Sequence, residues 1–222
     1  MDTITVETPG GPGRVFVSAP TRPRAALLLG HGAGGGIEAF DLEALAAHLP
    51  GAGIAVLRFE QPWRTAGRKI AGRPATLDQA WESALEHATA AFPGLPLLVG
   101  GRSAGARVAC RRFASPAIGV VCLSFPLHPP GKPEASRIGE LSGVAGPVLV
   151  IQGGRDPFGS AEELRAALAA AGDPALDRFR LIDIPGATHS FAPRTVAARE
   201  ASDQLGRSLA SHVTDFVDAL IG

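Results

Sequence analysis

Short apolar segments alternate with longer amphipathic segments along most of the chain. Two segments that flank a Pro/Gly turn, Thr3–Val6 and Arg14–Ser18, predict an N-terminal β-hairpin. Six further apolar runs predict strands, and such nearly continuous hydrophobic strands are typical of parallel sheets covered on both faces. These runs are Ala25–Leu29, Ile54–Phe59, Pro96–Gly100, Gly119–Leu123, Val148–Gln152 and Phe179–Ile184.

Helix start signals and helical spacing occur between these strands. Thr76–Gln79 and Ser160–Glu163 each match the capping box, so helices are expected to begin there. Apolar residues also recur every three or four positions in Ile37–Leu49 and from Leu205 to Leu220. Alternating strands and helices predict an α/β fold, with a mostly parallel sheet of about eight strands and helices on both faces.

Composition limits the class of protein. The chain has 222 residues, and we expect one domain over residues 1–222. Lys+Arg and Asp+Glu both number 21, which argues against nucleic-acid binding by bulk charge. No apolar run approaches the ~20 residues of a membrane span, and no signal peptide is visible. Cys110 and Cys122 lie in apolar segments and are expected to be buried free thiols of a reducing compartment. We therefore expect a cytoplasmic monomer or small homo-oligomer without nucleic-acid or membrane partners.

The strand-like run Pro96–Gly100 leads into Gly101-Arg-Ser-Ala-Gly105, which matches G-x-S-x-G. A strand, this pentapeptide and then a helix-like stretch, Ala104–Phe113, are the setting of a nucleophile elbow. Ser103 is therefore the candidate nucleophile, and an ordinary serine N-cap is the alternative. A similar segment, residues 206–210, lies inside the last predicted helix with no strand before it, so it is not a candidate.

A serine hydroxyl reacts only when a base accepts its proton. His189 follows the last strand-like run and gives the chain order Ser, Asp, His. Asp156 follows the preceding strand on a Gly-rich turn and would orient the imidazole. The alternatives are an ordinary loop histidine and an Asp-Pro turn. Three other carboxylates lie at or inside predicted elements and fit this role less well: Asp173, Asp177 and Asp183.

An oxyanion intermediate requires backbone N–H donors. Ala104, directly after the serine, would supply one amide. Ala33 would supply the other, with Gly34 as the nearest alternative, from the glycine-rich segment after the third strand. A flexible glycine loop is the competing interpretation, and the lysine and hydroxyl of a phosphate-binding P-loop are absent.

Two loops are expected to shape the pocket, Glu60–Pro74 and Pro126–Pro133. The first is basic, and Arg64 is a candidate for binding a carboxylate or phosphate of the substrate, although a solvated basic loop has the same composition. In the second, His128 would hydrogen-bond either a substrate or its own loop. These groups require no metal or organic cofactor, so none is expected.

The chain resembles the α/β-hydrolase superfamily in four motifs and in their order. These motifs are HGAGGG, GGRSAG, QGGRDPFG and ATHSF. The chain is also similar to a small group of dienelactone-hydrolase-like proteins, labelled after testis-expressed protein 30 and an NSL-complex subunit, from about Leu27 to Pro193. The resemblance implies an α/β-hydrolase fold without a large lid. It also implies Ser103, Asp156 and His189 as the catalytic triad.

The chain departs from that group in two segments. The elbow there usually reads closer to GGKSMGGR, whereas this chain has Arg102, Ala104 and Ala106. An alanine amide serves as well as a methionine amide, but the pocket wall becomes smaller. A segment that is usually aromatic-rich reads RFEQPW here, so Glu60 and Gln61 would alter what the pocket accepts.

The sequence thus predicts a serine hydrolase that cleaves an ester or related acyl bond of a small molecule through an acyl-enzyme. Thioester cleavage, lactone opening and acyl transfer use the same groups. The alternative is a non-catalytic scaffold or interaction protein of the same fold, which the likeness to a chromatin-complex subunit brings into consideration.

Overall fold

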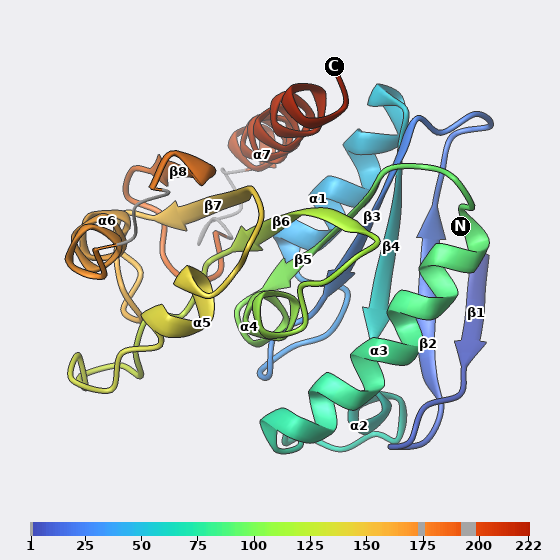
Figure 1. Cartoon of the computed structure of the whole chain (residues 1–222), viewed down its shortest axis with the longest axis horizontal. Helices are drawn as coiled ribbons and strands as arrows, with labels where there is room; N and C mark the ends of the chain where they lie inside the picture. Colours follow the sequence, from blue (N-terminus) through green and yellow to red (C-terminus); the bar gives the residue numbers. More distant parts are fainter. Residues whose placement is uncertain (1, 173–175, 192–198) are drawn as a thin grey trace.

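The computed structural model describes residues 2–172, 176–191 and 199–222, and its strands form one eight-stranded sheet (Figure 1). The strand order is β1-β2-β4-β3-β5-β6-β7-β8, in which β3 to β8 are parallel and β1 and β2 form an antiparallel hairpin. The strands are β1 (Asp2–Val6), β2 (Gly13–Ser18), β3 (Ala25–Gly30), β4 (Ile54–Glu60), β5 (Leu97–Arg102), β6 (Ala117–Leu123), β7 (Val148–Gly153) and β8 (Phe179–Ile184). The predicted hairpin and the six predicted parallel strands are confirmed.

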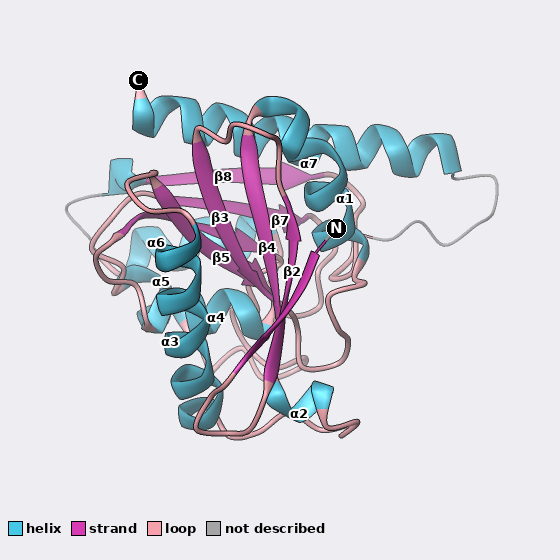
Figure 2. Cartoon of the chain, turned by 90° about the vertical axis from the view of Figure 1, so that its right-hand side faces the viewer, coloured by secondary structure: helices cyan, strands magenta, loops and turns pink. Residues whose placement is uncertain are grey.

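Helices cover both faces of the sheet, as the sequence predicts (Figure 2). One face carries α1 (Phe40–His48) and α7 (Arg199–Ile221). The other carries α3 (Pro74–Ala91), α4 (Ala104–Arg111), α5 (Ile138–Ser142) and α6 (Ala161–Ala170). Short helical turns complete the described chain: α2 (Pro62–Thr65), Leu49–Ala52 and Leu176–Arg178.

The two faces bury separate apolar clusters because side chains alternate along each strand. In β3, Ala26 and Leu28 pack toward α3 and α4, whereas Leu27 and Leu29 pack toward α1 and α7. All six residues of β3 are buried, which explains the continuous apolar runs in the sequence.

The two predicted capping boxes have different outcomes. Ser160 forms one at the start of α6: its hydroxyl accepts the Glu163 N–H at 3.2 Å, and the Glu163 carboxylate accepts the Ser160 N–H at 2.8 Å. The predicted start at Thr76 is wrong, because α3 already begins at Pro74. Proline at the first helical position has a suitable φ and no N–H to satisfy, so it starts the helix before the predicted cap.

Cys110 and Cys122 are buried free thiols with their Sγ atoms 3.5 Å apart, as expected for cysteines in apolar segments. Within the described residues, no helix is long and apolar enough to cross a bilayer. Two positions named above, Asp173 and Pro193, lie outside the described residues.

The turn from β5 to α4 lies directly against the backbone of β3. A Cβ atom on Gly105 would meet the carbonyl group of Gly30, and a Cβ on Gly101 would lie 2.5 Å from the same carbonyl oxygen. Glycine is therefore required at Gly105 for strand and helix to approach each other this closely.

We predict that Gly105→Ala destabilises the protein by about 1–3 kcal/mol, because the new methyl group overpacks against immobile backbone. Gly139→Ala is the matched control: Gly139 also lies in a helix, but a Cβ there meets nothing within 4 Å. It is expected to leave stability unchanged or raise it by up to about 1 kcal/mol. Urea unfolding of both variants measures the effect, and equal stability of Gly105→Ala and the wild type would contradict it.

Candidate active site

Ser103 occupies the tight turn between β5 and α4. Its φ is 54° and its ψ is −112°, a conformation that non-glycine residues rarely adopt and that costs about 1–3 kcal/mol. Its N–H donates to the Leu123 carbonyl on the neighbouring strand at 3.0 Å, and its side chain caps no helical N–H. The ordinary N-cap interpretation is therefore not supported, and the turn presents the hydroxyl beyond the carboxyl end of the sheet.

Three side chains that are far apart in the chain meet at this edge. His189 Nε2 lies 2.9 Å from Ser103 Oγ, and His189 Nδ1 lies 2.8 Å from Asp156 Oδ2. Because Nδ1 faces a carboxylate, it carries the ring proton, which leaves Nε2 to accept the serine hydroxyl. The geometry is that of a nucleophile, a base and an orienting acid.

Asp156 is held by several groups besides the histidine. Its side chain has no exposed surface. Its Oδ1 accepts the Phe158 N–H at 2.9 Å, and its Oδ2 also accepts a hydrogen bond from Gln152 Nε2 at 3.0 Å. The same Gln152 amide donates to the Gly159 carbonyl at 2.6 Å. Hydrogen bonds to both oxygens fix the orientation of the carboxylate.

The loop that carries His189 is tied to the neighbouring Asp156 loop. The Arg155 N–H donates to the Ala187 carbonyl at 2.9 Å. The Phe191 N–H closes the turn onto the Thr188 carbonyl at 3.1 Å, and the buried Phe191 has a φ of 53°. The Phe158 ring packs on the imidazole with ring centroids 4.3 Å apart. These contacts limit rotation of the His189 ring.

The loop after β3 is fixed by two buried side chains. His31 Nδ1 donates to the Gly32 carbonyl at 2.8 Å, and its Nε2 accepts the Gln61 N–H at 3.0 Å. Burial lowers the pKa of His31, which agrees with a neutral ring that both donates and accepts. Arg58 Nη1 donates to the Ile37 carbonyl at 2.9 Å.

Ala33 and Ala104 line one small cavity beside Ser103. Among the described residues, neither of their N–H groups donates to another protein group. The cavity has a volume of about 10 Å³, and its walls include apolar and aromatic side chains, namely Trp63, Ala71, Leu77, Trp81 and Val108.

The two predicted substrate-binding side chains have partners on the protein itself. Arg64 Nη2 lies 2.9 Å from Glu38 Oε1, in a pair that is partly exposed. His128 Nδ1 lies 2.9 Å from the Pro129 carbonyl, and its Nε2 lies 3.7 Å from Glu163 Oε1. The Nδ1 contact of His128 is with its own loop, one of the two roles that the sequence left open.

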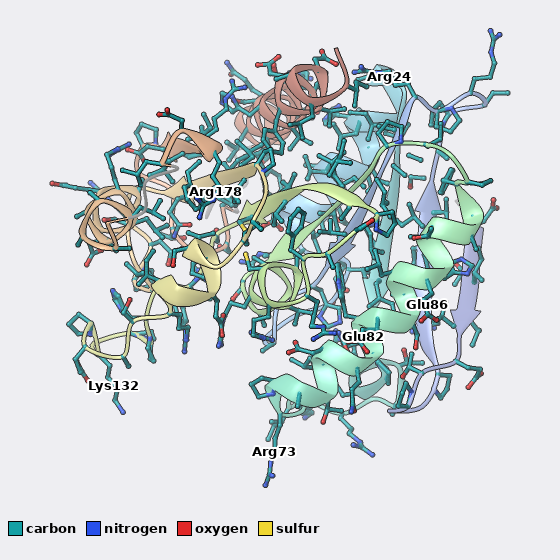
Figure 3. All side chains as sticks on the ribbon, viewed as in Figure 1. Arg24, Arg73, Glu82, Glu86, Lys132 and Arg178 are labelled. Carbon is teal, nitrogen blue, oxygen red and sulfur yellow. The ribbon has the colours of Figure 1, made fainter. Side chains whose placement is uncertain are left out.

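The other positively charged side chains of the two loops point into solvent. Arg73 and Lys132 extend away from the rest of the protein (Figure 3), and Arg68 and Lys69 are exposed. A solvated basic loop therefore describes these residues better than an anion site does.

A buried ion pair lies directly beside Ser103. Arg102 Nε lies 3.1 Å from Asp41 Oδ2, and Arg102 Nη2 donates to the His189 carbonyl at 2.7 Å. Asp41 is fully buried at the start of α1, and its Oδ1 accepts the Leu42 N–H at 3.0 Å. Burial raises the pKa of Asp41 from 3.8 to about 6, and the Arg102 charge limits that rise.

Sequence reasoning missed four residues that support the site: Asp41, Arg102, Gln152 and Phe158. Gln152 left a signal, since it is a polar residue at the end of a buried apolar strand, four positions before Asp156. Asp41 gave no such signal in the sequence. An acidic residue in the first turn of a helix is common, because its charge interacts favourably with the helix dipole while it faces solvent.

A larger cavity of about 670 Å³ lies at the opposite edge of the sheet. It is lined by residues such as Phe92, Leu95 and Ile118, near the amino ends of β5 and β6. Ligands of parallel α/β sheets bind at the carboxyl ends of the strands, so we assign no part of the reaction to this cavity. The described residues contain no group of three or more His, Cys, Asp and Glu side chains arranged to hold a metal ion.

The raised pKa of Asp41 makes stability depend on pH. The native state binds this proton more tightly than the unfolded chain does, so the contribution of Asp41 to stability falls as pH rises from about 4 to about 6. Relative to Asp41→Asn, which does not titrate, the loss is on the order of 3 kcal/mol at 1.36 kcal/mol per pKa unit. Urea unfolding of both proteins from pH 4 to pH 8 tests this, and a difference that does not change with pH would refute it.

Comparisons with known proteins give a consistent fold. A family model described as an alpha/beta hydrolase domain matches residues 23–218. An alpha-beta serine hydrolase homologue from Coxiella burnetii superposes with a TM-score of 0.75 at 16% identity, covering 95% of this chain and 96% of that one. A serine hydrolase without a lid from Xanthomonas campestris gives a TM-score of 0.73 at 22% identity, covering 97% of this chain and 94% of that one. A cold-adapted esterase from an Arctic intertidal metagenomic library gives a TM-score of 0.69 at 17% identity, covering 99% of this chain and 93% of that one.

These structures share the fold of this chain. Like the Xanthomonas campestris protein, the described part of this chain has no lid domain. The family model extends from the residues just before β3 almost to the end of α7, so it includes all six parallel strands and the turn that carries Ser103. The chain therefore belongs to the alpha/beta hydrolase domain family.

Proposed function

We propose that this protein is a serine hydrolase that cleaves an ester or related acyl bond. One observation carries the proposal: Ser103 Oγ, the His189 ring and the buried Asp156 carboxylate form a continuous chain of contacts of 2.9 and 2.8 Å. A protein that serves only as a scaffold has no physical reason to keep a strained serine in contact with an oriented imidazole.

In the proposed mechanism, Ser103 Oγ attacks the carbonyl carbon of the substrate while His189 Nε2 accepts the hydroxyl proton. Asp156 stabilises the imidazolium that forms. The tetrahedral intermediate collapses as His189 donates that proton to the leaving alcohol, which leaves an acyl group on Ser103. Water then attacks the acyl-enzyme by the same route in reverse, releasing the acid and restoring the serine hydroxyl.

The Ala33 and Ala104 amides are the proposed donors to the oxyanion. Two features support them: both residues line the cavity beside Ser103, and both N–H groups lack protein partners among the described residues. The hydrogen bonds of His31 and Arg58 to the loop after β3 would hold Ala33 in place before substrate arrives, which is the preorganisation that such a site needs.

We place the protein nearest to the dienelactone-hydrolase-like group that its motifs resemble, acting on a small acyl substrate without a cofactor. Arg64 remains a proposed contact for an anionic substrate group, since it adjoins Trp63 in the cavity wall and its ion pair with Glu38 is partly exposed. The paired free thiols, Cys110 and Cys122, favour a reducing compartment such as the cytoplasm.

Labelling with a fluorophosphonate tests the nucleophile. We predict that the wild type is modified at Ser103, that Ser103→Ala is not modified, and that His189→Ala reacts at least about 10³-fold more slowly because the base is lost. Intact mass and peptide mapping measure both the extent and the position of the label.

Ser208→Ala is the matched control, since Ser208 lies in the similar segment within α7 and should not affect labelling. Labelling that persists in a folded Ser103→Ala variant would overturn the assignment. A wild type that neither reacts with the probe nor cleaves any short p-nitrophenyl ester would favour the scaffold alternative.

The small cavity also limits the acyl group. Its volume of about 10 Å³ corresponds to roughly one water molecule, so we predict that p-nitrophenyl acetate is cleaved at least about tenfold more efficiently than the butyrate. Leu77→Ala removes one wall and is expected to narrow or reverse this preference. Leu85→Ala, on the same helix but outside the cavity lining, is the control. Values of kcat/KM for the two esters measure the effect, and faster cleavage of butyrate by the wild type would contradict it.

A further inference from the structure

Arg102 connects three segments that meet at the proposed site. It is the last residue of β5 and directly precedes Ser103. Its Nη2 donates to the His189 carbonyl at 2.7 Å, and its Nε lies 3.1 Å from Asp41 Oδ2 at the start of α1. One guanidinium thus links the serine turn, the histidine loop and a helix on the sheet.

The Arg102–Asp41 pair is far less exposed than the surface ion pairs of this protein. The side-chain exposures of Arg102 and Asp41 are 13% and 0%, whereas those of Arg64 and Glu38 are 37% and 55%. Exposed pairs hold their side chains weakly because water competes for both charges. A buried pair whose groups also make hydrogen bonds has a fixed geometry instead.

The hydrogen bond to His189 acts on the residue that carries the proposed base. Among the described residues, Arg102 is the side chain that binds the main chain of His189; the other hydrogen bonds of this loop involve Ala187, Thr188 and Phe191. If the His189 carbonyl shifts, the Cα atom and the ring shift with it. Nε2 then leaves its position 2.9 Å from Ser103 Oγ.

We propose that Arg102 is a positioning residue that holds His189 against Ser103, and that Asp41 fixes the direction of its guanidinium. This inference rests on the proposed function, since it assigns Arg102 a role in that reaction. Arginine suits the position because its planar, always charged group donates a hydrogen bond to the His189 carbonyl while its charge lies against the Asp41 carboxylate. A lysine ammonium on a flexible chain holds both partners less rigidly.

The test compares Arg102→Met, Arg102→Lys and Asp41→Asn with the wild type, using p-nitrophenyl acetate. We expect Arg102→Met to lower kcat by about 10- to 100-fold with KM nearly unchanged, because a misplacement of about 1 Å costs up to about 10² in rate. Arg102→Lys and Asp41→Asn should lie between Arg102→Met and the wild type. The rate of fluorophosphonate labelling should fall by the same factors.

Arg107→Met is the matched control. Arg107 lies in the helix that follows Ser103 and forms a two-pronged pair with Glu140 at 2.7 and 2.6 Å, at side-chain exposures of 22% and 21%. The Arg107→Met variant loses a comparable ion pair that does not contact the histidine loop, so its kcat should match that of the wild type. Equal losses of kcat in the Arg102→Met and Arg107→Met variants would refute a specific role for Arg102.

A readout that needs no turnover separates this inference from the proposed function. The Nδ1 proton of His189, hydrogen-bonded to Asp156, should give a downfield proton resonance, identified by its loss in Asp156→Asn. We expect that resonance in the wild type and in Arg107→Met, and its weakening or loss in Arg102→Met. An unchanged resonance in a folded Arg102→Met variant overturns the inference. A changed resonance in a protein that cleaves no ester supports the positioning role and defeats the proposed hydrolase.

Discussion

The close approach of the serine turn to the backbone of β3 is the constraint on which the site depends. Gly105 and Gly101 leave no room for a side chain against Gly30, so β5 and α4 are pressed onto the neighbouring strand. This contact, together with the hydrogen bond from the Ser103 N–H to Leu123, holds the serine at a φ of 54°. Contacts in the rest of the sheet stabilise this strained backbone conformation, which an isolated loop would relax.

The other two members of the proposed triad lie on loops, and the structure compensates by binding those loops to each other and to the sheet. Gln152, at the end of a buried strand, orients the Asp156 carboxylate. The main chains of the two loops pair between Arg155 and Ala187. The sheet and the contacts between the two loops thereby support the placement of both side chains, which the proposed reaction needs because it tolerates little misplacement.

The Arg102–Asp41 pair illustrates how such support has a thermodynamic cost. Asp41 is fully buried, and its raised pKa means that its ionised form disfavours folding at neutral pH. In our proposal the same charge directs Arg102 toward His189. Residues that order a functional site often lower the stability of the folded protein, which is the usual trade-off between stability and activity in enzymes.

Local patterns in the sequence were enough to predict the parallel strands and the serine turn, and to select three residues that the structure brings into contact, Ser103, Asp156 and His189. Apolar runs and glycine-rich turns are visible within a few positions of the chain. Only the tertiary structure brought Arg102 to Asp41 and to the His189 carbonyl, contacts that span 61 and 87 positions of the chain. The sequence also could not tell that Arg64 pairs with Glu38, or that His128 binds its own loop. The partner of a polar side chain is set by how distant segments pack, and no local periodicity encodes that packing.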